Sequence, residues 1–439
     1  MTPIDKGTDN REERLAGVPL EAIAARTGTP FYLYRADEVR ASLAALREAA
    51  MGPGLQVRFA LKACSARRVL EEVRDAGLWI DAVSGNEILR ARAAGFPGGI
   101  TPPVVLLSAD VFRDNAIEVV LRERVLANLG SPRMVEDLAR AGWRGPIGLR
   151  LNPGFGHGHV EACDTGGPSS KHGIWPDDEV SVRRAADARG FPIVLLHSHI
   201  GTGAGVEEFD ANMERLIDFF AARVAGYPAL EAVNFGGGIP HPYRPGEPPV
   251  ILGPLGAILR RARDEFTRLA GRPIRVEIEP GRFVVAGAAA VVTRVTDLKR
   301  TGTNEKGEGL TFVMVDAGFV DLVRPAMYGA YHHITAHGRT IEADGAMRAV
   351  VGGPLCESGD VFTRDAEEFV EPRELPRVRP GDLLILHDAG AYGAAMSSNY
   401  NSIGRAPQVW WDDGRAHLMS RRESFEDIVR AECWEELRP

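Results

Sequence analysis

Short apolar runs recur along the first 281 residues of the chain, and segments with a helical pattern separate them. Runs rich in Val, Ile, Leu and Phe are typical of buried parallel strands. In the intervening segments, such as 87–94, 132–141 and 208–223, apolar residues fall at three- and four-residue intervals, as in an amphipathic helix. The strand-like runs are 57–63, 78–84, 104–110, 124–130, 146–152, 193–199, 232–238 and 275–281. Eight strand–helix repeats predict an α/β fold of the TIM (β/α)8 barrel type.

An open, doubly wound sheet is the alternative architecture for the same repeats. Such a sheet is expected to carry a glycine-rich phosphate loop directly after its first strand. Here the first run ends in Lys62-Ala63-Cys64-Ser65, without a glycine run, which favours the barrel. The connection at 153–175, between the fifth and sixth runs, is long and rich in Gly and His. A loop of that length in a barrel is more often functional than idle.

The pattern changes after residue 281. Strand-like runs at 288–296, 311–316, 348–351 and 382–386 follow one another without long helices between them. Turn-rich pieces such as 301–304 separate them, which is typical of an antiparallel β domain. An early run at 30–34 also has strand character and is expected to join this C-terminal sheet. We therefore predict a barrel domain over 36–282 and a β-sandwich or β-barrel domain made of 1–35 and 283–439.

Composition narrows the class of protein. Hydrophobic residues make up 44% of the 439 residues and charged residues 26%, as in a folded protein with a sizeable core. The net charge is −8 and the basic residues are scattered, which argues against a nucleic-acid partner. The four cysteines form no C-x-x-C pair, which gives no zinc or disulfide framework and fits a reducing compartment. With no signal-like N-terminus and no run of 18 apolar residues, we expect a cytoplasmic protein without a membrane segment.

Reactive side chains gather where the predicted barrel strands end. In barrel enzymes the loops at the carboxyl ends of the strands converge on one mouth. Lys62 lies within an apolar strand-like run, where an unpaired ammonium group would be costly to bury unless a partner or a covalent bond removed the cost. The other residues at the predicted strand ends are Asp81, Arg150, Asn152, His197, His199, Gly236, Gly237, Gly238, Glu279 and Arg282.

Each of these features also has an ordinary structural explanation. A lysine at a strand end can simply reach into solvent. Three glycines can form an ordinary turn, although they can also bring backbone N–H groups close to an anion at a helix start. The stretch from Asp81 to Glu87 can be a cap that opens the next helix. Glu279 can form an ion pair with Arg282.

Taken together, the residues at this rim predict a site for pyridoxal 5′-phosphate. Lys62 would bind the cofactor covalently, and the glycine N–H groups would hold its phosphate. His199 would stack on the ring, and Glu279 would keep the ring nitrogen protonated. A protonated ring is a strong electron sink, which suits reactions that leave an electron pair on the α-carbon of an amino acid.

A series of ordered motifs resembles the fold-type III pyridoxal-phosphate decarboxylases, with an alanine racemase-like barrel, and within them the diaminopimelate decarboxylases. The resemblance covers nearly the whole chain. The motifs are FALKAC around Lys62, DAVSGNE at 81–87, HSHIGT at 197–202, GGG at 236–238, EPGR at 279–282, RPAMY at 324–328, CESGD at 356–360, AYG at 391–393 and MSSNYN at 396–401.

The resemblance implies a role for each matched residue. Lys62, His199, Glu279 and Cys356 would be catalytic, with Cys356 as the proton donor. The cofactor would also contact Asp81, Arg150, Thr202, Gly236, Gly237, Gly238, Arg282 and Tyr392. The substrate would contact Arg282, Arg324, Tyr328, Glu357 and Tyr392. The resemblance further implies a homodimer in which the β domain completes the active site of the partner subunit, with Cys356 and Glu357 reaching across.

The implied reaction is the decarboxylation of meso-2,6-diaminopimelate to L-lysine and CO2, the last step of lysine biosynthesis. The planar forks of Arg282 and Arg324 suit a substrate with two carboxylates. The same chemistry on another amino acid, such as D-lysine, D-ornithine or a precursor of a specialised metabolite, is the alternative. A non-catalytic cofactor carrier would have little use for the β domain or Cys356. A racemase would place an arginine, not a carboxylate, at the ring nitrogen.

Two departures from the family pattern bear on the substrate. Thr202 stands where the family usually has Ser, and it keeps the hydroxyl for a phosphate contact. The stretch 160–164 contains Glu161, Cys163 and Asp164, where similar enzymes are expected to have a more polar stretch with a lysine. If this loop closes over the site, the change of charge would alter which substrates are accepted.

Overall fold

The computed structural model describes residues 11, 13–156, 165–201, 205–305, 307–365 and 369–435. Thr202 and the stretch 160–164 with Cys163 lie outside these residues. The chain divides into two units. We call Val39–His241 with Pro249–Val285 the barrel unit, and Met1–Glu38 with Pro242–Pro248 and Ala286–Pro439 the sheet unit. The predicted barrel domain, 36–282, includes 242–248, whereas the barrel unit leaves this segment out.

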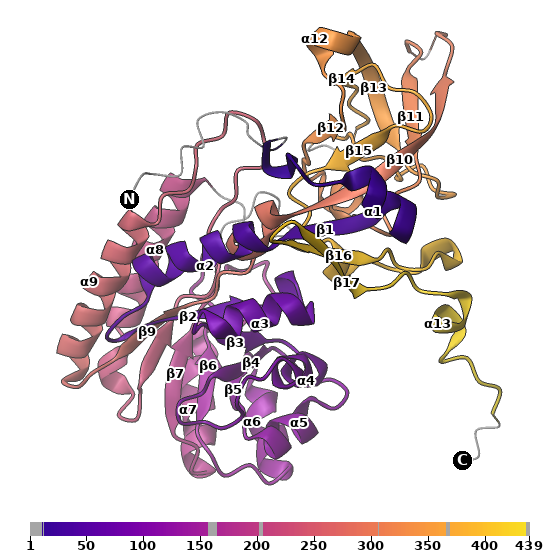
Figure 1. Cartoon of the computed structure of the whole chain (residues 1–439). Helices are drawn as coiled ribbons and strands as arrows, with labels where there is room; N and C mark the ends of the chain where they lie inside the picture. Colours follow the sequence, from indigo (N-terminus) through magenta and orange to yellow (C-terminus); the bar gives the residue numbers. More distant parts are fainter. Residues whose placement is uncertain are drawn as a thin grey trace. The chain divides into compact units, whose positions relative to one another are not determined.

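The barrel unit contains a closed barrel of eight parallel strands (Figure 1). Each strand pairs with the next, and β2 pairs with β9 to close the ring. All eight predicted runs are strands, so the predicted barrel is confirmed. The strands are β2 (Leu55–Ala60), β3 (Trp79–Ala82), β4 (Val105–Ala109), β5 (Leu126–Leu129), β6 (Ile147–Arg150), β7 (Ile193–His197), β8 (Ala232–Asn234) and β9 (Arg275–Ile278).

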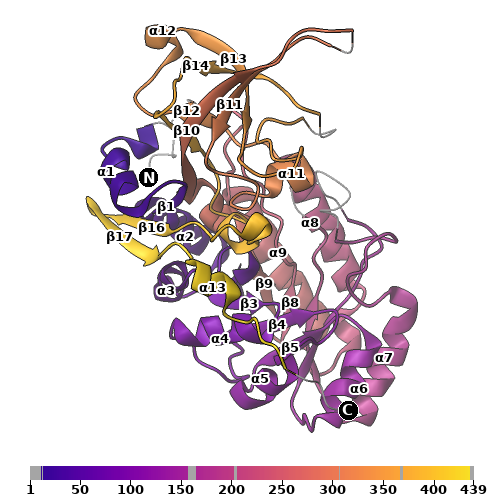
Figure 2. The same cartoon turned by 90° about the vertical axis from the view of Figure 1, so that its right-hand side faces the viewer.

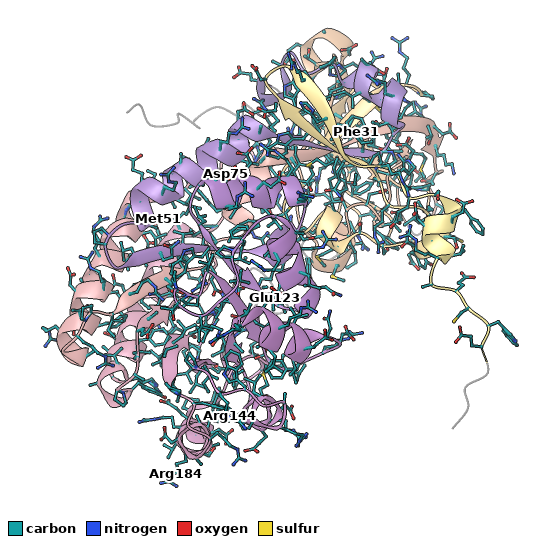
Figure 3. The ribbon with its side chains drawn as sticks, turned by 60° about the horizontal axis from the view of Figure 1, so that its bottom comes forward. Phe31, Met51, Asp75, Glu123, Arg144 and Arg184 are labelled. Carbon is teal, nitrogen blue, oxygen red and sulfur yellow. The ribbon has the colours of Figure 1, made fainter. Side chains whose placement is uncertain are left out.

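Amphipathic helices surround the barrel and bury their apolar stripes. In α6, for example, Met134, Val135 and Leu138 are buried. On α7, Arg184 points away from the unit into solvent (Figure 3). The helices are α2 (Ala36–Ala50), whose first residues belong to the sheet unit, α3 (Arg67–Asp75), α4 (Gly85–Ala93), α5 (Ala116–Glu123), α6 (Pro132–Arg140), α7 (Pro176–Ala188), α8 (Val206–Ala221), α9 (Gly253–Ala270) and α10 (Arg282–Val285), with the 3-10 turns η2 (Leu61–Ala63) and η4 (Val224–Gly226).

The inside of the barrel carries a buried ion pair between its first and last strands. Arg58 of β2 donates from Nε to Glu277 Oε2 of β9 at 2.6 Å, and both side chains are fully buried. Arg58 also donates to the carbonyl of Pro103 at 2.7 Å, and Arg275 donates to Glu277 Oε1 at 2.7 Å. A buried ion pair of this kind holds only when its remaining polar groups are also bonded, as they are here.

The sheet unit is built around a nine-stranded sheet (Figure 2). Its main path runs β14-β13-β11-β10-β1-β16-β17, with β15 paired to β10 and β12 paired to β15. The strands are β1 (Phe31–Arg35), β10 (Ala289–Arg300), β11 (Thr311–Val315), β12 (Ile334–Ala336), β13 (Ala346–Gly352), β14 (Arg373–Pro376), β15 (Leu383–Leu386), β16 (Gln408–Asp412) and β17 (Arg415–Ser420). The helices are α1 (Leu20–Thr27), α11 (Arg324–Tyr328), α12 (Ile341–Asp344) and α13 (Phe425–Val429), with the 3-10 turns η1 (Glu13–Leu15), η5 (Ala286–Ala288), η6 (Ala394–Met396) and η7 (Tyr400–Ser402).

The early strand joins the C-terminal sheet, as expected. β1 lies between β10, to which it is antiparallel, and β16, to which it is parallel. Leu20, Phe31, Val292 and Ile385 are among the buried residues of one core cluster, which joins residues 18–33 to residues of the C-terminal strands. The sheet is mostly antiparallel, but β11 and β13 form a second parallel pair. The predicted combination of a barrel with a C-terminal β domain is confirmed.

Among the described residues, no helix has both the length and the apolar character needed to cross a lipid bilayer.

Candidate active site

Lys62 lies in a 3-10 turn directly after the first barrel strand. The strand β2 ends at Ala60, and η2 carries Lys62 with its side chain exposed. The predicted run 57–63 is therefore too long at its end, because the strand stops two residues before the lysine. The chain has only five lysines, and the barrel unit contains two of them, Lys62 and Lys171. Few amines are thus available for a covalent bond to a carbonyl group.

Glu279, just beyond β9, is buried with both of its carboxylate oxygens bonded. His197 Nε2, at the end of β7, donates to Oε2 at 3.1 Å, and Asn234 Nδ2, at the end of β8, donates to Oε1 at 2.7 Å. Burial would raise the pKa of Glu279, but His197, Arg58 and Lys62 hold it below its ordinary value. Glu279 is thus bonded by His197 and Asn234, whereas the sequence suggested an ion pair with Arg282. A carboxylate oxygen has two acceptor positions, so each can still face a ligand.

His199 lies two residues after β7 and stays uncharged. Burial, together with the positive charges of Lys62 and Arg150, lowers the pKa of His199 well below its ordinary value. Its backbone carbonyl accepts a hydrogen bond from Thr165 Oγ1 at 2.9 Å, which fixes the backbone under the ring. A neutral imidazole presents a flat, uncharged face that can stack on an aromatic ligand.

The glycine run 236–238 follows β8 and packs against this rim. A Cβ on Gly236, which has φ +67°, would come 2.6 Å from His199 Cβ, and one on Gly237 would come 2.5 Å from the Glu279 carbonyl oxygen. Only glycine fits so close to these backbones. The expectation of a helix start here is wrong, because the next helix, α9, begins at Gly253. Within the described residues, the N–H groups of Gly237 and Gly238 have no hydrogen-bond acceptor.

Asp81 is the last but one residue of β3 and is almost completely buried. Burial raises the pKa of Asp81 well above its ordinary value, and the negative charge of Glu279 adds to the effect, while Lys62 and a hydrogen bond from Ser108 oppose it. Ser84, three residues later, accepts a hydrogen bond from the Glu87 N–H at 3.2 Å at the start of α4. The capping function considered for 81–87 is therefore confirmed for Ser84.

Arg150, at the end of β6, lies in a polar cluster with the long loop. Its Nη1 is 3.6 Å from Asp110 Oδ2, and Asp110 also accepts from His172 Nδ1 and, at 2.9 Å, from the Gly173 N–H. Burial would raise the pKa of Asp110, but His172 and Arg150 lower it. Asn152 holds the described part of the loop by bonds to the backbone of Gly154, Gly167 and His172.

Several buried polar atoms at this mouth lack a protein partner. Within the described residues, Asp81 Oδ1, His197 Nδ1, Ser198 Oγ and His199 Nδ1 accept or donate no hydrogen bond. Buried polar atoms are almost always bonded, so four orphans at one barrel mouth indicate a place for a polar ligand. An ionised carboxylate, a neutral imidazole, free backbone donors and an exposed lysine suit a phosphorylated aromatic aldehyde. The residues therefore fit pyridoxal phosphate.

In the sheet unit, Arg324 is held by a histidine that sequence reasoning did not find. Arg324 begins α11, is 2% exposed and donates from Nη1 to His332 Nε2 at 2.8 Å. His332 Nδ1 donates to the His387 carbonyl at 2.8 Å, so Nε2 is free to accept. Burial and the charge of Arg324 lower the pKa of His332 to about 3. Arg324 also covers the ring of Tyr243 at 4.6 Å.

The exposed residues Cys356 and Glu357 lie in a loop that is tied to two others of the sheet unit. The Cys356 N–H donates to Asn401 Oδ1 at 3.1 Å. Asp360 accepts from the N–H groups of Leu355 and Phe319 at 2.8 and 2.7 Å.

Two tyrosines of the predicted substrate site also belong to the sheet unit. Tyr328 ends α11, and Tyr392, with φ +58°, follows β15; both are partly buried.

Comparison with known proteins identifies the family. Residues 36–286 match the family model of the pyridoxal-binding domain of the pyridoxal-dependent decarboxylases. The chain belongs to this family. It is 40% identical to the diaminopimelate decarboxylase of Escherichia coli K12 over 97% of each chain. A crystal structure of a diaminopimelate decarboxylase matches with a TM-score of 0.87 at 40% identity, covering 97% of this chain and 98% of the other. That of the Helicobacter pylori enzyme with L-lysine matches with a TM-score of 0.81 at 27% identity, covering 94% and 98%.

Membership in the pyridoxal-dependent decarboxylases confirms the cofactor prediction, since the matched domain is the one that binds pyridoxal. It also confirms the predicted class of enzyme. Among the described residues, no group of three or more His, Cys, Asp and Glu side chains is arranged to hold a metal ion.

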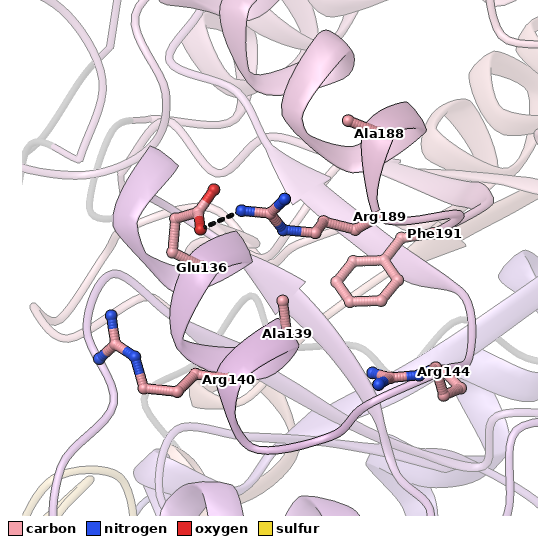
Figure 4. A pocket seen from close by; sticks show the side chains of 7 residues that line it. All are labelled: Glu136, Ala139, Arg140, Arg144, Ala188, Arg189 and Phe191. Atoms are coloured by element: carbon pink, nitrogen blue, oxygen red, sulfur yellow. Dashed lines mark hydrogen bonds and ion pairs between the residues drawn. The ribbon is translucent and has the colours of Figure 1, made fainter.

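A hollow of this decarboxylase lies at the end of the barrel opposite the mouth (Figure 4). Arg140 and Arg189 lie at the C-terminal ends of α6 and α7, and Arg144 and Phe191 precede β6 and β7. Arg189 donates to Glu136 at 2.6 Å. Positive side chains are favoured at helix C-termini, so these arginines have a structural explanation. The hollow has none of the residues predicted for catalysis.

Sequence reasoning missed three buried groups of this decarboxylase: Asn234, the Arg58–Glu277 pair and His332. Asn234 and Arg58 are polar residues within apolar runs, which is a detectable signal because a buried polar residue needs a partner. The identity of the partner was not detectable, since Arg58 and Glu277 are 219 positions apart.

Proposed function

We propose that this protein decarboxylates meso-2,6-diaminopimelate to L-lysine and CO2 with pyridoxal 5′-phosphate. The observation that carries the proposal is the 40% identity to diaminopimelate decarboxylases over almost the full length of both chains. The polar groups at the barrel mouth support it, because they suit this cofactor. The reaction would serve as the last step of lysine biosynthesis.

When bound, the cofactor supplies an electron sink for the pair of electrons that CO2 leaves on the α-carbon. Lys62 would hold the cofactor covalently and return as a free amine when substrate binds. Glu279 is ionised and buried, so it would keep a proton on the ring nitrogen. Neutral His199 would cover one ring face. The cofactor would also contact Asp81, Arg150, Thr202, Gly236, Gly237, Gly238, Arg282 and Tyr392.

The substrate would be held by arginine forks and tyrosines. Arg282 and Arg324 would bind carboxylates, and His332 keeps the Arg324 guanidinium in one orientation. Tyr328, Glu357 and Tyr392 would complete the contacts. Cys356, whose side chain is exposed on the sheet unit, would deliver a proton to the α-carbon after CO2 leaves. We further propose a homodimer in which Cys356 and Glu357 act in the partner subunit's site.

Substrate specificity tests the proposal. Purified protein with pyridoxal phosphate is incubated with meso-diaminopimelate, D-lysine or D-ornithine, and CO2 and the amine products are measured. We expect CO2 and L-lysine from meso-diaminopimelate at a kcat/KM far above that for the other two. Turnover of a monocarboxylic diamino acid without turnover of the diacid would show instead that the family chemistry acts here on another substrate.

We place this reaction in the cytoplasm. The described cysteines Cys64, Cys356 and Cys433 are all free thiols, which suits a reducing compartment.

A further inference from the structure

Asn234, the last residue of β8, is fully buried and bonded on both sides of its amide. Its Nδ2 donates to Glu279 Oε1 at 2.7 Å and lies 3.4 Å from Glu277 Oε2. Its Oδ1 accepts from the Gly236 N–H at 2.8 Å. The reverse orientation of the amide would turn its oxygen toward two carboxylates and its NH2 group toward an N–H donor. The contacts therefore fix the amide in one orientation.

These bonds form a closed circuit of three residues. Asn234 joins the carboxylate of Glu279 to the N–H of Gly236, and the Glu279 N–H donates back to the Gly236 carbonyl at 2.8 Å. Glu277 Oε2, which also lies 3.4 Å from Asn234 Nδ2, accepts a hydrogen bond from Arg58 Nε at 2.6 Å. The three residues therefore lie next to the fully buried Arg58–Glu277 pair, and none of them can move alone without breaking a hydrogen bond.

The two ends of the circuit lead to different parts of the proposed cofactor site. Glu279 is the carboxylate proposed for the ring nitrogen, and Gly236 begins the glycine run proposed for the phosphate. The Gly236 N–H is already used by Asn234, so the amide sets the conformation of the loop, while no acceptor within the described part of the chain uses the N–H groups of Gly237 and Gly238.

We propose that Asn234 is a positioning residue that couples the two ends of the cofactor, fixing Glu279 for the ring and the glycine run for the phosphate at the same time. The inference rests on the proposed binding of the cofactor at the barrel mouth. It adds that one amide positions both the group that would contact the ring and the groups that would contact the phosphate.

Two variants separate the two bonds of the amide, which we call the ring arm (Nδ2 to Glu279) and the phosphate arm (Oδ1 to the Gly236 N–H). Asn234→Asp keeps an oxygen for the Gly236 N–H but turns a second carboxylate oxygen, in place of the donor, toward Glu279, whereas Asn234→Ala loses both bonds. The full-length protein, freed of cofactor, is titrated with pyridoxal 5′-phosphate and with pyridoxal, which lacks the phosphate, and binding is followed by absorbance. Glu279→Gln serves as the reference for loss of the ring arm.

We expect Asn234→Asp to weaken binding of both ligands by a similar factor, about 10-fold or more, as loss of a hydrogen bond to a charged group predicts. The ratio of its affinities for pyridoxal phosphate and pyridoxal, which is its preference for the phosphorylated ligand, should stay within about 2-fold of the wild-type ratio, because the bond that positions the glycine run is kept. Asn234→Ala should in addition lose about 10-fold of that preference, because the glycine run is released.

A matched control is Asn212→Asp, which makes the same change at a buried amide of α8 whose Nδ2 donates to the Glu208 carbonyl. It should bind both ligands like wild type. Thermal unfolding checks the fold of every variant, and Asn234→Ser replaces the alanine variant if that is unfolded. Equal phosphate preference in wild type, Asn234→Asp and Asn234→Ala, all folded, would overturn the coupling. Failure of wild type to bind pyridoxal phosphate would instead contradict the proposed function.

Discussion

Two layers of polar residues in the same barrel are satisfied in opposite ways. Inside the barrel, the Arg58–Glu277 pair has its polar groups bonded by the protein, and burial would raise the pKa of Glu277 but Arg58 and Arg275 hold it low. At the mouth, Asp81 and His199 each have a buried polar atom without a partner in the described residues, and burial raises the pKa of Asp81. Bonded polar groups of this kind hold the fold together, whereas several buried polar atoms without a partner at one rim indicate a place for a ligand.

The difference has a physical basis. Removing either member of the inner pair would leave a buried charge, so that layer tolerates little change. We propose that the mouth keeps its unpaired groups because a bound cofactor would satisfy them. Substitutions in the two layers should therefore affect different properties, namely the free energy of unfolding for the inner layer and cofactor binding for the mouth.

Removing the lysine of the mouth should have the largest effect. Lys62→Ala is expected to lose turnover completely, together with the visible absorption band of the covalently bound cofactor, while its unfolding temperature without cofactor stays near that of wild type. Lys171→Ala, the same change at the other lysine of the barrel unit, is the control and should keep the band. A visible band that persists in folded Lys62→Ala would contradict this role.

Mixing two inactive variants should restore part of the activity. Cys356→Ala and Lys62→Ala change residues of different units, and in a shared-site homodimer one of the two sites in each hybrid is intact. After subunit exchange we expect at most about a quarter of wild-type turnover, from the statistics of a two-fold dimer. Mass spectrometry of hybrids in which one variant is isotope-labelled verifies the exchange. Hybrids that form but stay inactive would rule out sharing.

Breaking the inner pair should act mainly on the stability of the barrel. Arg58→Met leaves the buried carboxylate of Glu277 with Arg275 as its remaining ion-pair partner, and this loss of charge compensation is expected to cost about 3–5 kcal/mol of unfolding free energy. The double variant Arg58→Met/Glu277→Leu should recover most of this loss. Denaturant unfolding of both variants measures the difference. If the double variant were no more stable than the single one, the loss of charge compensation at Glu277 would not be the cause.

The two layers should respond to pH with opposite signs. Because the pKa of Glu277 is lower in the folded than in the unfolded protein, its carboxylate stabilises the fold at pH values above the unfolded pKa. This stabilisation is lost as the pH falls toward the folded pKa. The pKa of Asp81 is higher in the folded than in the unfolded protein. The stability of the fold therefore decreases as the pH rises from the unfolded pKa of Asp81 to its folded pKa. At pH 7, cofactor-free Asp81→Asn should therefore be more stable than wild type and Glu277→Gln less stable. Denaturant unfolding at pH 4–8 checks this, and equal signs would contradict it.

The smallest effect is expected at a residue that only caps a helix at the rim. Ser84→Ala loses the cap of α4 and should cost about 1 kcal/mol of unfolding free energy. Its affinity for pyridoxal phosphate should match that of wild type, as measured by absorbance titration. A clear loss of affinity would place Ser84 in the cofactor site.

The barrel was predictable because its eight strands are continuous apolar runs and their carboxyl ends form one mouth. Strands such as β17, whose first four residues are exposed, lack that signal and were missed. The end of β2 at Ala60, two residues before Lys62, was also missed, because the apolar run does not show where the strand's hydrogen bonding stops. The partners of Glu279 come from β7 and β8, and only the closed barrel brings them together.

The most direct test of the account is to find which lysine carries the cofactor. Protein loaded with pyridoxal phosphate is reduced with borohydride, which turns a lysine–cofactor bond into a stable amine, and its peptides are analysed by mass spectrometry. The account predicts one phosphopyridoxyl group per chain, on Lys62. A label on Lys171 or on a lysine of the sheet unit, or no label on protein that decarboxylates its substrate, would contradict it.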